Sequence, residues 1–143
     1  MRLHSMVVIA LCATTAAACK GRQTAEGATR DNATAAALTV RSVELGRSID
    51  ADRRIQGGTT TFRRGDTIYA VVETSGESSG TLQARWTYQD GQVVDQSSQS
   101  IAASDSRTEF HISKPDGWPA GKYRLELLQN GAVLETKEFE VSR

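Results

Sequence analysis

From Leu38 to the end of the chain, hydrophobic and polar side chains tend to alternate with the period of two that is typical of β-strands. The first stretch changes register near Ser42. The run at 67–74 is almost entirely β-forming, which predicts a strand buried on both faces. The stretches that we expect to form strands are LTVRSVEL (38–45), TIYAVVET (67–74), LQARWTY (82–88), QVVDQSSQSI (92–101), TEFHI (108–112), KYRLELL (122–128) and AVLETKEFEV (132–141).

Two dipeptides between these stretches predict hairpins. Asp90-Gly91 and Asn130-Gly131 each have the composition of a two-residue β-turn. The side chains that we expect to face the core are Leu82, Ala84, Trp86, Tyr88, Phe110, Ile112, Tyr123, Leu125, Leu127, Phe139 and Val141. About seven short strands with regular turns indicate an antiparallel β-sandwich, and closure into a barrel is the alternative.

Several of these segments resemble known domains. Trp86 in a mid-chain strand, GKYRLELL as the next-to-last strand and the Asn130-Gly131 hairpin resemble immunoglobulin-like and fibronectin-like domains of bacterial envelope proteins. FRRGDTIYAVVETSG, ARWTYQDGQVV and ISKPDGWPAGKYRLE resemble small proteobacterial envelope lipoproteins of unassigned activity. The resemblance covers most of residues 38–143 and implies an all-β fold with one immunoglobulin-like antiparallel sandwich of about seven strands. The antibody disulfide is absent, so Trp86 is expected to pack on aliphatic side chains alone.

The segment KPDGWPAGKY, residues 114–123, contains both prolines of the chain and one of its two tryptophans. Trp118 is a candidate ligand-binding residue if its indole is exposed. The alternative, which we favour, is a structural corner. Pro115 and Gly117 suit a tight turn, Pro119 extends the backbone before it, and Trp118 then covers the end of the core.

The N-terminal stretch MRLHSMVVIALCATTAAACK has the layout of an export signal: a basic start, a short apolar run and small residues. Small residues before Cys19 resemble the lipobox of bacterial lipoproteins, which implies cleavage after residue 18 and acylation of Cys19. Ala16 stands where leucine is usual in that motif. An ordinary cleavage site that releases a soluble periplasmic protein is the alternative. The anchor is favoured because Cys19 is the one cysteine outside the signal, and it therefore has no disulfide partner.

The chain is thus expected to contain a lipoprotein signal peptide at 1–18, the lipidated cysteine with a flexible tether at 19–37, and the sandwich domain at 38–143. The tether is rich in Ala, Thr, Gly and charged residues, with no aromatic or large aliphatic side chain, so it cannot bury enough apolar surface to fold. Lys20 follows the cysteine, where Asp often signals retention in the inner membrane of such lipoproteins. An outer-membrane location is therefore favoured, with the domain in the periplasm or on the surface.

Composition and charge exclude some functions. The 143 residues, 38% of them hydrophobic, are sized for one domain. Basic and acidic residues are balanced at 17 each, so no electrostatic field would draw the protein to nucleic acid. His111 is the one histidine beyond the signal, and it alternates with core residues, so it is expected on the solvent side. A lone histidine supports neither a zinc site nor a hydrolase triad, and Asp50 and Asp52 lack the rest of a calcium loop. We therefore expect no metal and no cofactor.

Two arginine pairs remain as candidate ligand-binding residues, Arg53 with Arg54 and Arg63 with Arg64. They would form a basic patch for an anionic glycan or phosphate if the TTTF segment paired back, although solvated turn flanks are the simpler interpretation. The sequence therefore predicts a lipid-anchored binding or assembly module without catalytic activity. Its membrane contact is the acylated Cys19, and its partner is an envelope protein or a glycan. The alternative is an accessory or inhibitor subunit of a periplasmic enzyme.

Overall fold

The computed structural model describes residues 38–77 and 79–143. The predicted signal peptide, the lipidation site at Cys19 and the tether lie outside these residues. Within the described part, the chain contains no helix of the length and hydropathy needed to cross a bilayer.

Nine strands account for the regular structure of the described residues. They are β1 (Thr39–Ile49), β2 (Ile55–Gly58), β3 (Thr61–Phe62), β4 (Ile68–Ser75), β5 (Gly80–Tyr88), β6 (Val93–Ile101), β7 (Ser106–Ile112), β8 (Gly121–Gln129) and β9 (Ala132–Val141). β1 and β4 to β9 are the seven strands that the sequence predicts. β2 and β3 are two short additional strands.

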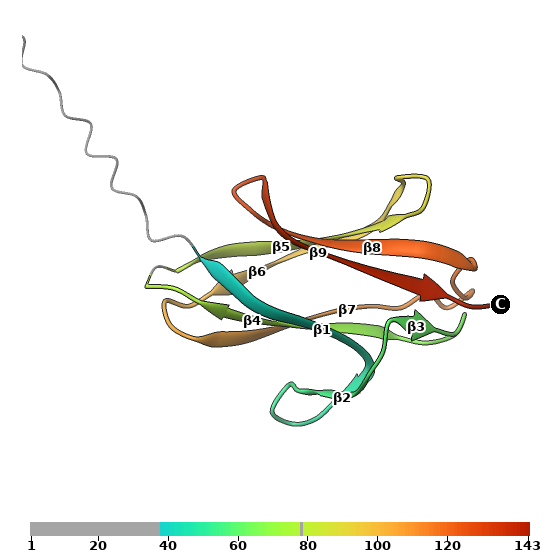
Figure 1. The fold of residues 1–143 in the computed structure, drawn as a ribbon, viewed down its shortest axis with the longest axis horizontal. Helices are drawn as coiled ribbons and strands as arrows, with labels where there is room; N and C mark the ends of the chain where they lie inside the picture. Colours follow the sequence, from blue (N-terminus) through green and yellow to red (C-terminus); the bar gives the residue numbers. More distant parts are fainter. Residues whose placement is uncertain (1–37, 78) are drawn as a thin grey trace, which may run out of the picture. The chain divides into compact units, whose positions relative to one another are not determined.

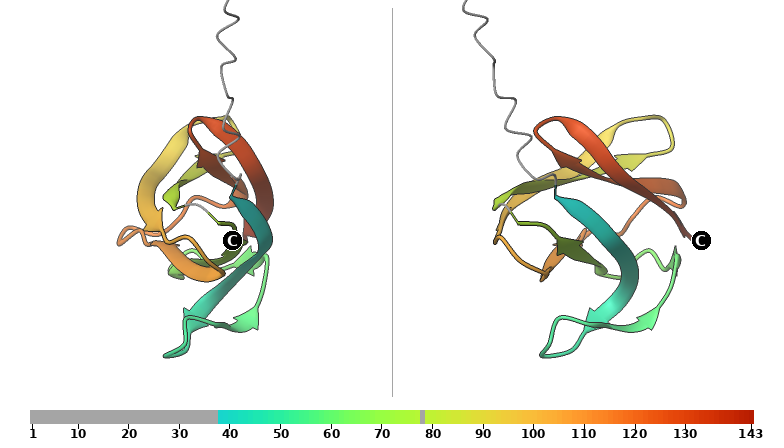
Figure 2. Two further views of the ribbon diagram at one scale, coloured as in Figure 1. Left: turned by 90° about the vertical axis from the view of Figure 1, so that its left-hand side faces the viewer. Right: turned by 60° about the vertical axis from the view of Figure 1, so that its left-hand side comes forward.

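The strands form two layers (Figure 1). One sheet has the order β2-β1-β4-β7 and the other β3-β9-β8-β5-β6. Every neighbouring pair is antiparallel except β3 and β9, which run parallel over two residues. The two sheets pack face to face as a sandwich, which Figure 2 shows from two further sides. The predicted all-β antiparallel sandwich is confirmed.

The core consists of the side chains that alternate strands direct between the sheets. All the inward positions predicted from the sequence are buried except Tyr88, which is half-buried and packs against the core. β4 is fully buried on its inner face, but on its outer face only Val71 is buried and Tyr69 and Glu73 are half-buried, so the prediction of burial on both faces holds only in part. The predicted register change in β1 is present as a bulge between Val40 and Ser42.

The two predicted hairpins have different turns. Asn130 and Gly131 both have positive φ, at 52° and 82°, as a two-residue type I′ turn requires. At Asp90-Gly91 the prediction of a two-residue turn is wrong. The Gly91 N–H donates to the Tyr88 carbonyl and the Tyr88 N–H donates to that of Gln92, so the loop has an additional residue. Gly91 alone takes a positive φ, 85°, which fits a type I turn closed by a glycine bulge.

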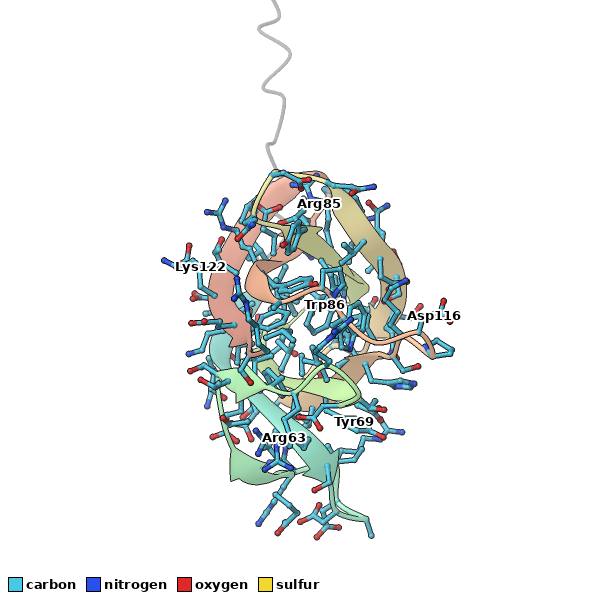
Figure 3. All side chains as sticks on the ribbon, turned by 90° about the vertical axis from the view of Figure 1, so that its right-hand side faces the viewer. Arg63, Tyr69, Arg85, Trp86, Asp116 and Lys122 are labelled. Carbon is cyan, nitrogen blue, oxygen red and sulfur yellow. The ribbon has the colours of Figure 1, made fainter. Side chains whose placement is uncertain are left out.

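Trp86 lies at the centre of the sandwich, fully buried, as Figure 3 shows. The expectation that it packs on aliphatic side chains alone is wrong. Its ring meets Phe139 edge-on, with centroids 5.8 Å apart, and Phe139 also contacts Phe62 and Tyr123. Without a disulfide between the sheets, this aromatic cluster fills the middle of the core. The indole N–H of Trp86 has no acceptor among the described residues.

Candidate functional site

The corner between β7 and β8 is built from the segment that contains both prolines. The Gly117 N–H donates to the Lys114 carbonyl across the turn, and Gly117 has a φ of 80°. A Cβ at Gly117 would approach the Arg64 carbonyl oxygen to 3.3 Å, so the turn needs glycine for space as well as conformation. This corner lies against the loop that precedes β4.

Trp118 connects the corner to the loop before β4 by donating two hydrogen bonds. Its backbone N–H donates to the Arg64 carbonyl at 2.7 Å, and its indole N–H donates to the Asp66 carbonyl at 2.9 Å. The residue is only 4% exposed, and its ring packs edge-on against Tyr123. The prediction that Trp118 covers the end of the core is confirmed. A role for Trp118 in ligand binding stays a prediction, and an exposed stacking surface is not available for it.

A cavity of about 530 Å³ lies beside this corner, between it and the β5–β6 hairpin. We call it the aromatic cavity. Its lining residues are Tyr88, Asp90, Gln92, Val93, Val94, Ser113, Lys114, Pro115, Trp118, Pro119 and Tyr123. The tyrosine hydroxyls are already engaged, since Tyr88 donates to the Ala120 carbonyl and Tyr123 to that of Pro119. Burial, assisted by the neighbouring Tyr88, raises the pKa of Tyr123 to about 12, so its hydroxyl stays protonated. The rings therefore offer apolar surface to the cavity.

β6, which borders this cavity, is an edge strand. Its residues are exposed along nearly the whole length, and two of the three exposed large hydrophobic side chains of the described residues, Val93 (50%) and Val94 (38%), lie at its start. Figure 2 shows β6 at the margin of its sheet. On the side away from β5, no strand of the described residues pairs with it.

All four arginines of the two pairs are exposed, and Arg54 and Arg64 have different surroundings. Arg54 lies over the outer face of the four-stranded sheet, where it lines a second hollow of about 310 Å³ with Glu73 and Arg107. Arg64, in the loop before β4, instead donates from Nε to the Trp118 carbonyl in the corner between β7 and β8. Figure 3 shows Arg63 in the lower part of the view, apart from Asp116 of the corner. In the TTTF segment (59–62), Thr61 and Phe62 pair with β9, and the Thr59 N–H donates to the Leu45 carbonyl of β1.

The second hollow is a satisfied ion-pair site. Arg107 Nη2 lies 2.6 Å from Glu73 Oε1, and Ser42 donates to the other carboxylate oxygen of Glu73. The hydrogen bond from Arg107, followed by that from Ser42, lowers the pKa of Glu73. Arg107 also donates to the Asp52 carbonyl, which holds the β1–β2 hairpin over the sheet. These contacts explain the hollow as structural.

Asp50 and His111, considered above as metal ligands from the sequence, form hydrogen bonds within the protein. Asp50 accepts the backbone N–H groups of Asp52 and Arg54, and the hydrogen bond from Arg54 is the main cause that lowers its pKa. His111 is exposed, as predicted, with Nδ1 2.8 Å from Glu109 Oε1. Among the described residues, no three acidic, histidine or cysteine side chains lie close enough together to hold a metal ion.

The carboxylate of Asp66 links the loop before β4 to β1. Its carboxylate accepts from Arg47 Nε at 2.7 Å and from the Arg63 N–H at 2.8 Å. Partial burial alone would raise the pKa of Asp66, but these hydrogen bonds and the two arginine charges lower it below 3.8 overall. The ionised carboxylate is therefore part of the folded structure.

We expect the stability of the protein to depend on this carboxylate in acid. Because its folded pKa lies below the ordinary 3.8, its stabilisation is complete above that value and is lost as the pH falls through the folded pKa. Asp66→Asn should be less stable than wild type at neutral pH and should lose less on acidification. Urea unfolding of the two proteins, at neutral pH and at a series of lower pH values down to below 3.8, measures both differences in stability. Equal acid sensitivity of the two proteins would contradict the assignment.

Comparisons with known proteins bear on the fold. No family model matches the chain, and no curated protein matches it. An immunoglobulin-like protein from Pseudomonas aeruginosa is similar in structure, with a TM-score of 0.52 at 21% identity, over 76% of this chain and 99% of that one. A cycloisomaltooligosaccharide glucanotransferase from Paenibacillus is similar over 75% of this chain but only 14% of its own, with a TM-score of 0.50 at 15% identity. These similarities show an immunoglobulin-like fold.

Sequence reasoning missed the aromatic cavity and the free edge of β6. The cavity joins residues from 88–94 with residues from 113–123, and no motif connects the two segments. One signal was present: the stretch QVVDQSSQSI has polar residues at the positions that should face inward, which is typical of a strand at the margin of a sheet.

Proposed function

We propose that this protein is a lipid-anchored binding or assembly module of the cell envelope, which recognises a partner protein through its sandwich domain and performs no catalysis itself. One observation carries the proposal: the long unpaired edge of β6 begins at the aromatic cavity. Edge strands with adjacent pockets recognise polypeptide by adding a strand to the sheet. A glycan partner is less well supported, because sugar rings stack on exposed aromatic faces and Trp118 is 4% exposed.

The proposed anchor is Cys19, at the end of the signal sequence. A single acyl chain contributes about 0.8 kcal/mol per buried methylene and holds a protein only reversibly, whereas several chains on one residue anchor it lastingly. Lys20 in place of Asp favours the outer membrane. The 18 residues between Cys19 and Leu38 would then serve as the tether between membrane and domain.

The anchor predicts the behaviour of a single variant. Cys19→Ser should abolish metabolic labelling with a fatty acid, and the protein should accumulate as uncleaved precursor. Electrophoretic mobility and detergent partition of the two proteins measure this, with Cys12→Ser, inside the signal, as the matched control. A wild-type product that is soluble, cleaved and unlabelled would refute the anchor.

Partner recognition is tested separately, by crosslinking in intact cells from photoreactive residues placed at positions 94 and 133. Both positions are exposed valines, but only Val94 borders the cavity. We expect a discrete protein adduct from position 94 alone. A periplasmic enzyme in that adduct, inhibited or positioned by the protein, would replace the assembly role with that of an accessory subunit. No adduct from position 94, or the same adducts from both positions, would count against recognition through this surface.

A further inference from the structure

The β6 strand is the most accessible of the four edge strands in the described sandwich. The other three are β2, β3 and β7. β2 has four residues and ends in two glycines, and β3 has two residues. β7 has seven residues, all but one of them at least partly buried, and the side-chain amide of Gln99 in β6 donates to its Glu109 carbonyl. β6 has nine residues, and none of them is proline, lysine or arginine, which often keep an edge from pairing. It has two other such features, a bulge where it pairs with Trp86 and Thr87, and one charged residue, Asp95.

The hydrogen-bonding pattern shows which peptide groups of β6 are free. The Tyr88 N–H points to β6, where it donates to the Gln92 carbonyl, and alternate residues of β5 point the same way. Trp86, Ala84 and Leu82 therefore bond to their partners in β6, which are Asp95, Ser97 and Gln99. The peptide groups of the residues between, Gln96, Ser98 and Ser100, point away from the sheet.

The aromatic cavity opens at one end of this row. Val93 and Val94 belong both to the exposed start of β6 and to the lining of the cavity. A bulge between Trp86 and Thr87 shifts the pairing register there, so that β6 bends where the cavity begins. A polypeptide that extends along Gln96 to Ser100 and continues past Val94 would reach the mouth of the cavity, where an apolar side chain could be buried away from water.

The charge on β6 further limits which polypeptide could bind at this edge. Asp95 is the one charged residue of β6, and its side chain lies on the row that includes Ser97 and Gln99. A residue directly opposite in an added strand would have its Cβ about 5 Å away. Lysine or arginine at that position complements Asp95, whereas an acidic residue would be repelled.

A second copy of this chain does not meet these requirements. In an antiparallel pairing of β6 with itself about Ser97, Asp95 lies opposite Gln99 and Val93 opposite Ile101. Ile101 is 2% exposed and belongs to its own core, Val94 lies opposite Ser100, and the remaining facing residues are polar. Such a dimer supplies no apolar side chain to the cavity and no cation to Asp95.

We propose that β6 is the docking strand for an extended segment of a partner protein, which adds to the five-stranded sheet, inserts an apolar side chain into the aromatic cavity and places a nearby lysine or arginine opposite Asp95. This inference rests on the proposed function and specifies its recognition chemistry. Main-chain hydrogen bonds supply the affinity, and the cavity and Asp95 supply the selectivity.

The test uses a displayed library of random linear peptides at least as long as the nine residues of β6, selected on the full chain. We expect enriched peptides to combine an apolar residue with a lysine or arginine a few positions away. Selection on Asp95→Lys should instead enrich acidic residues at that position. Enriched peptides without the apolar and basic pair, or no enrichment at all, would overturn the proposal.

Variants of the edge then test how the peptides bind. Ser98→Pro removes a free N–H without breaking a hydrogen bond to β5. It should therefore lower the affinity for a selected synthetic peptide at least about tenfold, whereas Ser98→Thr should bind that peptide as wild type does. Val94→Asp should weaken binding, and Val133→Asp, at a valine on β9 that is 49% exposed against 38% for Val94, should not. Unchanged peptide affinity in Ser98→Pro or in Val94→Asp refutes the proposal. If the proline variant does not fold, the peptide affinity of Val94→Asp is the deciding measurement.

The outcomes separate this inference from the proposed function. A cellular crosslinked partner that binds Ser98→Pro and Val94→Asp normally would preserve the binding role and refute strand addition. Peptides that bind as predicted, in a protein without acylated Cys19, would refute the anchor and preserve the docking strand.

Discussion

Trp118→Ala is expected to destabilise the protein by about 3–5 kcal/mol, the range for removing a large aromatic side chain from a core. The indole is 4% exposed, packs edge-on against Tyr123 and donates to the Asp66 carbonyl, which its removal would leave without this donor. For a small domain this loss is a large part of the total stability. Thermal or urea unfolding of the purified protein measures it.

Two further variants separate the contributions of Trp118. Trp118→Phe keeps an aromatic ring but removes the indole N–H, so it should recover part of the stability and leave the Asp66 carbonyl unpaired. Val133→Ala, at a side chain 49% exposed, is the control and should change stability by less than about 0.5 kcal/mol. A Trp118→Ala protein as stable as wild type would mean that the indole does not hold the corner in solution.

This corner illustrates what the sequence could predict. Pro115, Gly117 and Pro119 restrict the backbone locally, so the turn and the extended residue between them follow from residue type. The contacts of Trp118 with the loop before β4 join residues more than fifty positions apart in sequence. No local pattern contains that pairing, although the burial of an indole between two fixed backbone segments could be expected.

Among the strands, too, some could be predicted from local sequence and others depend on long-range contacts. The inward rows of β5, β8 and β9 were predictable because alternation along a strand fixes which side chains share a face. β2 and β3 were not predicted, since Ile55–Gly58 contains two glycines and Thr61–Phe62 is too short to show a period. The strand β3 exists because Phe62 is buried against Phe139 and its backbone pairs with β9, both long-range effects.

The candidate site was harder to predict than the fold. Arginine pairs are conspicuous in a sequence, yet Arg54 and Arg64 serve different parts of the sandwich. The aromatic cavity depends on a gap between two loops, and the free edge of β6 depends on which strands fail to pair. Both are properties of the assembled sheets, so residue type along the chain gives only the indirect signal of polar inward positions in β6.

Phe139→Ala is the second substitution with a large expected effect, again about 3–5 kcal/mol. Phe139 is 3% exposed, and its ring lies 5.6 Å from that of Phe62 and 5.3 Å from that of Tyr123, in addition to its contact with Trp86. It therefore joins β3, β5 and β8 at the centre of the core. Phe139→Leu should cost less, because it keeps most of the apolar volume.

A double-mutant cycle identifies what Phe139 does for β3. If the edge-on contact with Phe62 holds β3 on β9, then Phe62→Ala and Phe139→Ala should not be additive, and the double variant should be more stable than the sum of the single losses predicts. Aromatic pairs of this geometry contribute about 0.5–1.5 kcal/mol beyond their buried area, which sets the expected coupling. Urea unfolding of the four proteins provides the measurement. Strict additivity would show that β3 is held by its backbone pairing with β9 and not by the ring contact.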